Sequence, residues 1–267
     1  MTPSSLDAVL FLDSGIGGRV YLEEFLRRRP SRCTAYLADD AWFPYGERSP
    51  DEVRRRVVEL AHAVAEIHPL AAIVVACNTA SVVSLPALRD AFSLPVVGTV
   101  PAVKPAAAQT RSGHIAILAT NRTVRDPYTQ ELVRQFARLA EVTRLGLPRL
   151  VAAAERNDAL DAPELLNAIE EDVVSALPAT VDTVVLACTH FVRLRPLFER
   201  LLGPAVTVVD SLDGVVNRLE AVLPSLPTGD HGTACPPRWY STAGEHRGPL
   251  WEALPLESSS LQGNHRR

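Results

Sequence analysis

The sequence predicts an α/β fold built from parallel sheets, and two observations lead to that prediction. Short apolar runs alternate with segments of helical periodicity through most of the 267 residues. Most of these runs show no period-two alternation, which is typical of strands covered on both faces of a parallel sheet. The order strand, helix, strand, helix therefore favours parallel strands joined by right-handed crossovers.

The expected strands are the apolar runs at 8–12, 34–38, 72–76, 96–98, 114–118, 181–187 and 206–209, with a short late strand at 238–241. Helices are expected at 20–28, 50–67, 127–141, 163–176, 194–202 and 214–222. Two of them have strong start signals, because Ser49-Pro50 and Asp126-Pro127 each place a capping residue before a proline in the first turn.

The chain also contains a partial internal sequence repeat. VVACNTAS at 74–81 is repeated in outline by VLACTHF at 185–191, and the strand ending in Asp13-Ser14 is matched by the one ending in Thr120. These repeated motifs predict two pseudo-symmetric, doubly wound domains with parallel sheets and an active site in the cleft between them, since ligands bind at the carboxyl ends of such strands. The expected limits are residues 1–99 plus 211–256, residues 100–210, and a disordered tail at 257–267.

Composition excludes several classes of protein. A net charge of -4 and a pI near 6.0 give no basic footprint for nucleic acid. No apolar run is long enough to cross a membrane and no signal peptide is visible, so a cytoplasmic location without membrane contact is expected. Thiols stay reduced there, and the four cysteines are expected to be free thiols, ligands or catalysts rather than disulfides. Cys33 and Cys235 have no polar companions, which indicates a structural role.

Cys77 and Cys188 differ because each lies where an apolar run stops and polar residues begin. A redox pair is disfavoured by the absence of a C-x-x-C motif. A metal site is disfavoured because only His190 would join them and ligand pairs at metal-site spacing are absent, so no metal is expected. Proton transfer fits best, since one thiolate can remove a proton while the opposite thiol returns one.

A pair of opposed thiols suits a carbon acid whose configuration is inverted, because the planar carbanion must receive its proton from the other face. Neutral donors for carboxylates are available nearby in Ser14, Asn78, Thr79 and Thr189. Asp13 and His190 could govern the protonation of the thiols. Taken singly, Asp13 also suits a helix cap and His190 a buried core histidine.

Two cofactor-dependent alternatives compete with this interpretation. The stretch DSGIGGRV at 13–20 partly imitates a dinucleotide fingerprint, with Asp39 and Asp40 about twenty residues later. Val20, however, stands where the third glycine should be. A pyridoxal phosphate enzyme would need Lys104, the one lysine of the chain, which lies in a proline-rich connection. No cofactor is therefore expected.

Several motifs in register resemble those of the glutamate racemases, in the aspartate/glutamate racemase superfamily. They are FLDSGIGG at 11–18, Asp39 with PYG at 44–46, ACNTAS at 76–81, VGTVPAVKPA at 97–106, LATNRTV at 118–124 and ACTHF at 187–191. The resemblance implies cofactor-independent interconversion of L- and D-glutamate, supplying D-glutamate for peptidoglycan. It leaves a homodimer open.

The resemblance also implies roles for particular residues. Cys77 would act on D-glutamate and Cys188 on L-glutamate. The substrate site would be lined by Asp13, Ser14, Tyr45, Gly46, Asn78, Thr79, Thr189 and His190, and the supporting residues would be Asp39, Glu155 and Thr120. Val192-Arg193 departs from the Pro-Leu usual after the second cysteine motif, and Leu212 departs from a usual glycine. These departures keep two alternatives open: a racemase of another amino acid or hydantoin, and a weakened enzyme that persists as a binding or inhibitor protein.

Overall fold

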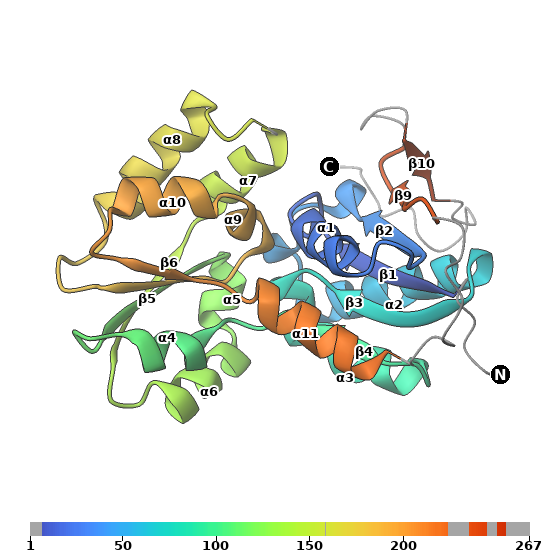
Figure 1. The fold of residues 1–267 in the computed structure, drawn as a ribbon, viewed down its shortest axis with the longest axis horizontal. Helices are drawn as coiled ribbons and strands as arrows, with labels where there is room; N and C mark the ends of the chain where they lie inside the picture. The colour runs from blue at the N-terminus through green and yellow to red at the C-terminus, as the bar shows by residue number, and fades with distance from the viewer. Residues whose placement is uncertain (1–6, 158, 224–234, 245–249, 255–267) are drawn as a thin grey trace.

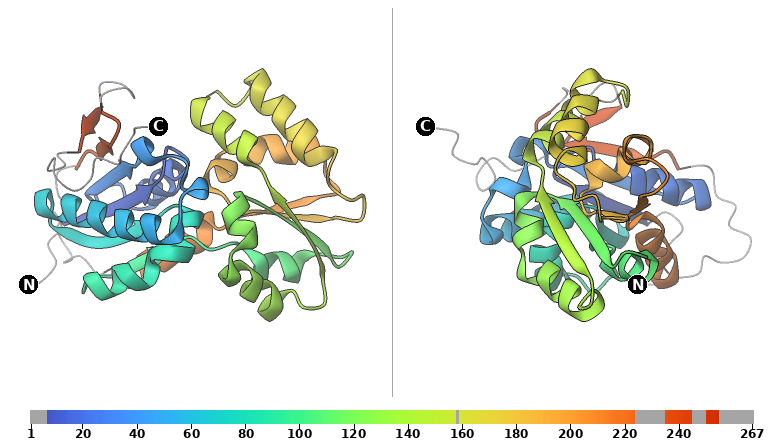
Figure 2. Two further views of the ribbon diagram at one scale, coloured as in Figure 1. Left: turned by 180° about the vertical axis from the view of Figure 1, so that it is seen from behind. Right: turned by 90° about the vertical axis from the view of Figure 1, so that its left-hand side faces the viewer.

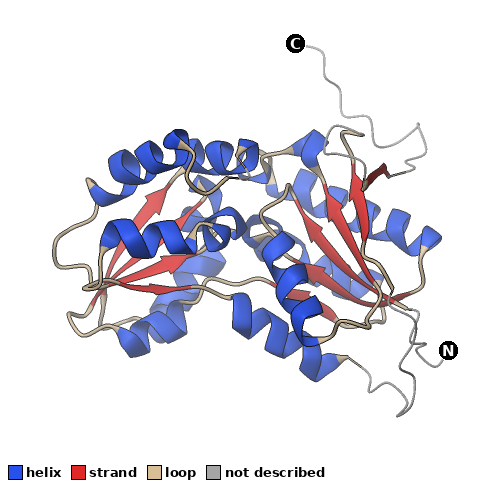
Figure 3. Cartoon of the chain, turned by 45° about the horizontal axis from the view of Figure 1, so that its top comes forward, coloured by secondary structure: helices blue, strands red, loops and turns tan. Residues whose placement is uncertain are grey.

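The chain folds into two lobes, each built around its own parallel sheet (Figure 1). The structure is a computed structural model that describes residues 7–157, 159–223, 235–244 and 250–254. The view from behind shows the two lobes side by side, meeting in the middle of the molecule (Figure 2). Each sheet is flanked by helices on both sides (Figure 3).

The first lobe contains a sheet with the strand order β10-β9-β2-β1-β3-β4. Its strands are β1 (Ala8–Asp13), β2 (Thr34–Ala38), β3 (Leu70–Val75), β4 (Val96–Gly98), β9 (Arg238–Ser241) and β10 (Trp251–Ala253). The helices between them are α1 (Arg19–Arg28), α2 (Pro50–Ile67) and α3 (Asn78–Ala91). The expected start of α2 is present as a full capping box between Ser49 and Glu52.

The second lobe contains a smaller sheet with the order β6-β5-β7-β8. Its strands are β5 (His114–Ala119), β6 (Glu141–Gly146), β7 (Thr183–Leu186) and β8 (Thr207–Val209). Its helices are α4 (Val103–Gln109), α5 (Asn121–Arg125), α6 (Pro127–Phe136), α7 (Pro148–Arg156), α8 (Pro163–Ile169), a π-helical turn at Glu170–Val174, α9 (Thr189–Arg193) and α10 (Arg195–Leu202). Helix α11 (Leu212–Val222) then returns to pack against α1 and β4.

The order β2-β1-β3-β4 in one sheet repeats as β6-β5-β7-β8 in the other. In this correspondence β3 matches β7, and each of these strands leads directly into a cysteine. The predicted α/β class with two related parallel sheets is confirmed. The domain limits at residues 99 and 211 stay predictions, and the expected tail at 257–267 lies outside the described residues.

Both faces of the central strands are buried, which explains why their sequences do not alternate. In β1, Val9 and Phe11 belong to one core, whereas Leu10 and Leu12 belong to another on the opposite face. The first of these cores continues into the second lobe through residues such as Leu118. A packed apolar layer therefore connects the two sheets. Among the described residues, no helix is both long and apolar enough to span a membrane.

The sequence-based expectations about elements were incomplete, because the helices α3, α4, α5, α7 and α9 and two strands were not among those expected. The helix predicted at 127–141 ends at Phe136, and β6 begins at Glu141. This strand is the edge of its sheet and none of its residues is fully buried, so its sequence lacks the apolar run that marked the other strands. The short strand β10 was also missed, and it is likewise an edge strand with two exposed residues.

The expectation of four free thiols was wrong for one pair. Cys33 and Cys235 form a disulfide, with Cα atoms 5.0 Å apart and 202 residues between them in sequence. The cause is the pairing of β9 with β2, which sets Arg238 opposite Ala35 and brings the residues before both strands together. Cys77 and Cys188 are free and buried.

Candidate active site

The two free cysteines occupy the same position in the two lobes. Cys77 is the N-cap residue of α3, after β3, and Cys188 is the N-cap residue of α9, after β7. Each is only 6% exposed, and both line one pocket between the lobes. The fold therefore brings together the two cysteines of the repeated sequence motifs.

Cys77 lies among groups from the first lobe. The backbone amide of Ala80 donates to its sulfur at 3.5 Å, and the Ser14 hydroxyl is 3.8 Å from the sulfur. Burial raises the pKa of the Cys77 thiol, and the nearby charge of Asp13 raises it further. The protonated thiol is thus the favoured form of Cys77 in this closed site.

Cys188 is paired with His190, two residues further along. The Cys188 sulfur is 3.8 Å from Nδ1 of His190, and Nε2 of His190 is 2.7 Å from a carboxylate oxygen of Glu155. Burial alone would lower the pKa of His190, but its contacts with Cys188 and Glu155 outweigh burial and raise it to about 10. A positively charged imidazole therefore lies beside the Cys188 sulfur, whereas the charged group near Cys77 is the Asp13 carboxylate. The two cysteines therefore have opposite electrostatic surroundings.

Asp13 connects the two sides of the pocket. It ends β1 and is fully buried, and its carboxylate accepts the backbone amide of Ser14 at 2.6 Å. Burial raises the pKa of Asp13 to about 6, although the charge of His190 acts in the opposite direction. The Asp13 carboxyl consequently changes protonation close to neutral pH.

A wall formed by residues 43–46 closes one side of the pocket. The Tyr45 hydroxyl donates to Asp39 at 2.6 Å, and Arg56 donates to both oxygens of the same carboxylate at 2.7 and 2.9 Å. Thr242, directly after β9, donates to Asp39 at 2.7 Å. Because Asp39 is fully buried and paired, it anchors the wall rather than contacting the pocket.

Hydroxyl groups link the lobes beside Cys77. Thr79 on α3 is 3.0 Å from the Thr120 hydroxyl and 3.2 Å from that of Thr123. A Cβ atom on Gly46 would lie 3.1 Å from Thr120, so a small residue there lets the wall approach the second lobe. Asn78 is 2% exposed, and neither its side-chain oxygen nor its nitrogen has a hydrogen-bond partner within the protein. Its amide is available to a ligand.

The structure gathers most of the sequence-predicted residues around one pocket, whose lining includes Ser14, Tyr45, Gly46, Cys77, Asn78, Thr79, Thr120, Cys188, Thr189 and His190. Three predicted residues, Asp13, Asp39 and Glu155, act behind this lining through the contacts described above. The pocket holds about 10 Å³ of free space, close to the room needed by one water molecule. The lobes are therefore closed against each other, and a substrate must separate them to enter.

Sequence reasoning missed Phe43, Thr123 and Arg56. The Phe43 ring packs against His190 with a centroid distance of 5.6 Å. Thr123 lies within the LATNRTV motif, so its position one turn after Thr120 was an available signal. No sequence signal indicated a role for Arg56, because arginine on an amphipathic helix normally faces solvent.

The glycine-rich loop serves lobe contact, not phosphate binding. A Cβ atom on Gly15 would lie 2.2 Å from the Glu155 side chain, and one on Gly17 would lie 2.6 Å from the Thr189 hydroxyl. Gly18 approaches Asp13 and Ala76 equally closely. The space that a pyrophosphate would need is thus occupied by the second lobe and by β1, so the dinucleotide alternative does not fit.

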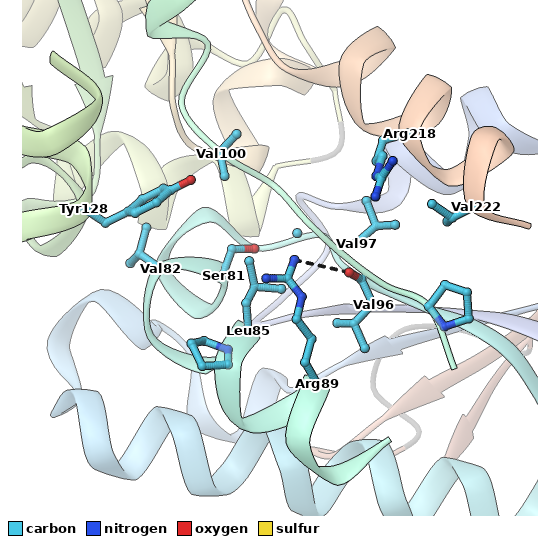
Figure 4. A pocket seen from close by; sticks show the side chains of 13 residues that line it. Ser81, Val82, Leu85, Arg89, Val96, Val97, Val100, Tyr128, Arg218 and Val222 are labelled. Atoms are coloured by element: carbon cyan, nitrogen blue, oxygen red, sulfur yellow. Dashed lines mark hydrogen bonds between the residues drawn. The ribbon is translucent and has the colours of Figure 1, made fainter. Parts of the chain in front are cut away.

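A larger cavity of about 680 Å³ lies elsewhere, between α3, β4 and the C-terminal half of α11 (Figure 4). Its lining includes Ser81, Arg89, Tyr128 and Arg218, and Arg89 reaches the carbonyl of Val96 at 3.5 Å. Neither free cysteine lines this cavity. The chemistry therefore belongs to the smaller pocket.

Comparisons with known proteins agree with this geometry. The family model described as Asp/Glu/Hydantoin racemase matches residues 22–219. The chain is 43% identical over 221 residues to the glutamate racemase of Salmonella gallinarum, covering 81% of this chain and 77% of that protein. It is 42% identical over 230 residues to the glutamate racemase of Pectobacterium carotovorum, covering 84% and 80%.

Solved structures give the same result for the fold. Escherichia coli glutamate racemase, in complex with L-glutamate and the activator UDP-MurNAc-Ala, matches with a TM-score of 0.75 and 38% identity over 89% of each chain. Thermus thermophilus glutamate racemase, in complex with β-chloro-D-alanine, matches with a TM-score of 0.74 and 26% identity over 96% of this chain and 99% of that one.

Proposed function

Because the chain belongs to the glutamate racemase family, we propose that it interconverts L- and D-glutamate without a cofactor, with Cys77 and Cys188 as the two acid–base residues. The observation that carries this proposal is the pair of buried free thiols that line one pocket from opposite lobes. We propose further that the product D-glutamate supplies peptidoglycan synthesis.

The surroundings of the thiols support an order of proton transfers. In the L-to-D direction, a Cys188 thiolate stabilised by protonated His190 takes the α-proton and leaves a planar carbanion. The Cys77 thiol then donates its proton to the opposite face, so that Cys188 ends as the thiol and Cys77 as the thiolate. The D-to-L direction reverses these steps. The raised pKa values of His190 and Cys77 fit the starting state of the first direction.

Neutral groups are proposed to hold the two carboxylates of glutamate. Asn78 is buried with an unsatisfied amide, and it lies in the first turn of α3, where backbone amides also point outward. Ser14, Thr79 and Thr189 add hydroxyl groups to the same lining. Such donors bind carboxylates without an arginine clamp.

The direct test is exchange and inversion in heavy water. Protein freed of metals and cofactors is incubated with L-glutamate, and optical rotation and deuterium at Cα are followed together. We expect rotation to be lost while deuterium enters Cα, because the returning proton comes from a solvent-equilibrated thiol. Retained rotation with no deuterium would refute the proposal, and a panel of other amino acids and hydantoins would identify a different substrate.

Substitution of each thiol tests the two-base scheme. Cys77→Ala and Cys188→Ala are each expected to abolish racemisation, because a single thiol cannot serve both faces of the carbanion. The Cys33→Ala/Cys235→Ala double variant is the matched control, since it removes two cysteines outside the pocket and should, while folded, keep activity within about twofold at 25 °C. Substantial turnover in either pocket variant would rule out the scheme.

Location and assembly belong to the proposal as well. A cytoplasmic location is proposed from the sequence, and a homodimer is left open. The Cys33–Cys235 disulfide gives a reason to measure the location, since disulfides are rare in reducing compartments. Cell fractionation and sedimentation of the purified chain test these two points.

A further inference from the structure

An arginine at the end of α9 contacts the end of α7. The guanidinium of Arg193 donates from Nη2 to the carbonyl of Asn157 at 2.6 Å and to that of Ala154. The last carbonyls of a helix have no partner within the helix and carry partial negative charge. Arg193 therefore caps the carboxyl end of α7 from a neighbouring helix.

The same two helices carry the pair that faces Cys188. Glu155 is adjacent to Ala154 on α7, and His190 lies one turn before Arg193 on α9. The Glu155–His190 contact of 2.7 Å and the Arg193 cap thus join the same two helices side by side. Glu155 also accepts the backbone amide of Ile16 from the first lobe at 3.0 Å. Any displacement of the end of α7 moves the carboxylate that holds His190.

We propose that Arg193 is a positioning residue of the active site: by capping α7 it sets Glu155 against His190, and through that pair it prepares the Cys188 side of the pocket. This inference rests on the proposed racemase function.

Arg193→Leu and Arg193→Lys test the role kinetically. Because the two enantiomers are equal in free energy, kcat/KM must fall equally in both directions, and we expect a loss of about tenfold in Arg193→Leu. Isotope effects show which of the two proton transfers is slowed. With α-deuterated L-glutamate the isotope effect on kcat/KM should rise, since abstraction by Cys188 becomes slower, whereas with α-deuterated D-glutamate it should fall. Arg193→Lys should recover part of the loss, because an ammonium keeps the charge but not the guanidinium geometry.

Arg149→Leu is the matched control. It removes an arginine from the opposite end of α7, where Arg149 pairs with Glu171 and Asp172 at the surface. Its kcat/KM is expected to stay within about twofold of the parent, with unchanged isotope effects. Parent-like kinetics in Arg193→Leu, or the same losses in Arg149→Leu, would overturn the proposal.

A second measurement does not depend on activity. Nuclear magnetic resonance of the His190 ring should show a lower pKa in Arg193→Leu than in the parent, because the contact with Glu155 that raises it is weakened. An inactive parent would refute the proposed function, and an unchanged His190 titration would refute the positioning role separately. If Arg193→Leu does not fold, the same titration in Arg193→Lys decides, with a smaller lowering expected.

Discussion

His190 is the residue whose protonation most clearly ties the site to stability. Its ordinary pKa of 6.5 is raised to about 10 in the folded chain by Cys188 and Glu155, despite burial. The folded state therefore binds this proton more tightly, and the resulting stabilisation is complete below pH 6.5 and is lost as the pH rises to about 10. Relative to His190→Gln, the parent should lose about 3–5 kcal/mol of unfolding free energy between pH 6 and pH 10. Urea unfolding at both pH values measures this loss. The same change in unfolding free energy with pH in both proteins would contradict the prediction.

Residues at strand ends could be assigned from the sequence, whereas residues that act through distant partners could not. Cys77, Cys188 and His190 follow apolar runs directly, so their place at the sheet edge follows from parallel topology. Arg56 is buried because its guanidinium pairs with the buried carboxylate of Asp39, 17 residues earlier in the sequence. A contact of that kind depends on how α2 packs, which no local pattern records.

Among the elements, β9 joins the late part of the chain to the first sheet, and the Cys33–Cys235 disulfide holds it there. A cross-link between residues so far apart in sequence restricts the unfolded chain strongly. We expect a dithiol reductant to lower the unfolding free energy by about 2–4 kcal/mol. Urea unfolding with and without reductant measures the change. The Cys33→Ala/Cys235→Ala variant should be equally destabilised and insensitive to the reductant. An unfolding free energy of the parent that does not change on reduction would contradict the expectation.

Buried strands and helices with explicit start signals were predictable, whereas the exposed edge strands β6 and β10 were not. Helix α2 begins at its capping box and α6 at Asp126-Pro127, as their sequences indicate. Strand β6 lies at an edge and has no continuous apolar run, and its first residue was included in the preceding predicted helix. The disulfide was hidden for a related reason: pairing between β2 and β9 is set by packing across the whole lobe, not by neighbouring residues.

At the scale of the whole molecule, the site exists only when the lobes meet. The first lobe contributes Cys77 with its wall, and the second contributes Cys188 with His190 and Glu155. The loop after β1 reaches across the boundary, where Ile16 donates to Glu155. Because the pocket between the lobes has only about 10 Å³ of free space, we expect the fit between this loop and α9 to control turnover.

Gly17→Ala tests that fit. An added Cβ atom would lie 2.6 Å from the Thr189 hydroxyl and 2.7 Å from the backbone nitrogen of His190, and the backbone atom cannot move unless α9 moves with it. We expect kcat/KM to fall by at least about tenfold, because Cys188 is displaced from its partner across the pocket. Gly214→Ala in α11 is the control, since its Cβ would meet nothing within 4 Å. It should keep full activity and gain up to about 1 kcal/mol of unfolding free energy. Equal activity in the two variants would show that closure of the loop on α9 does not limit the reaction.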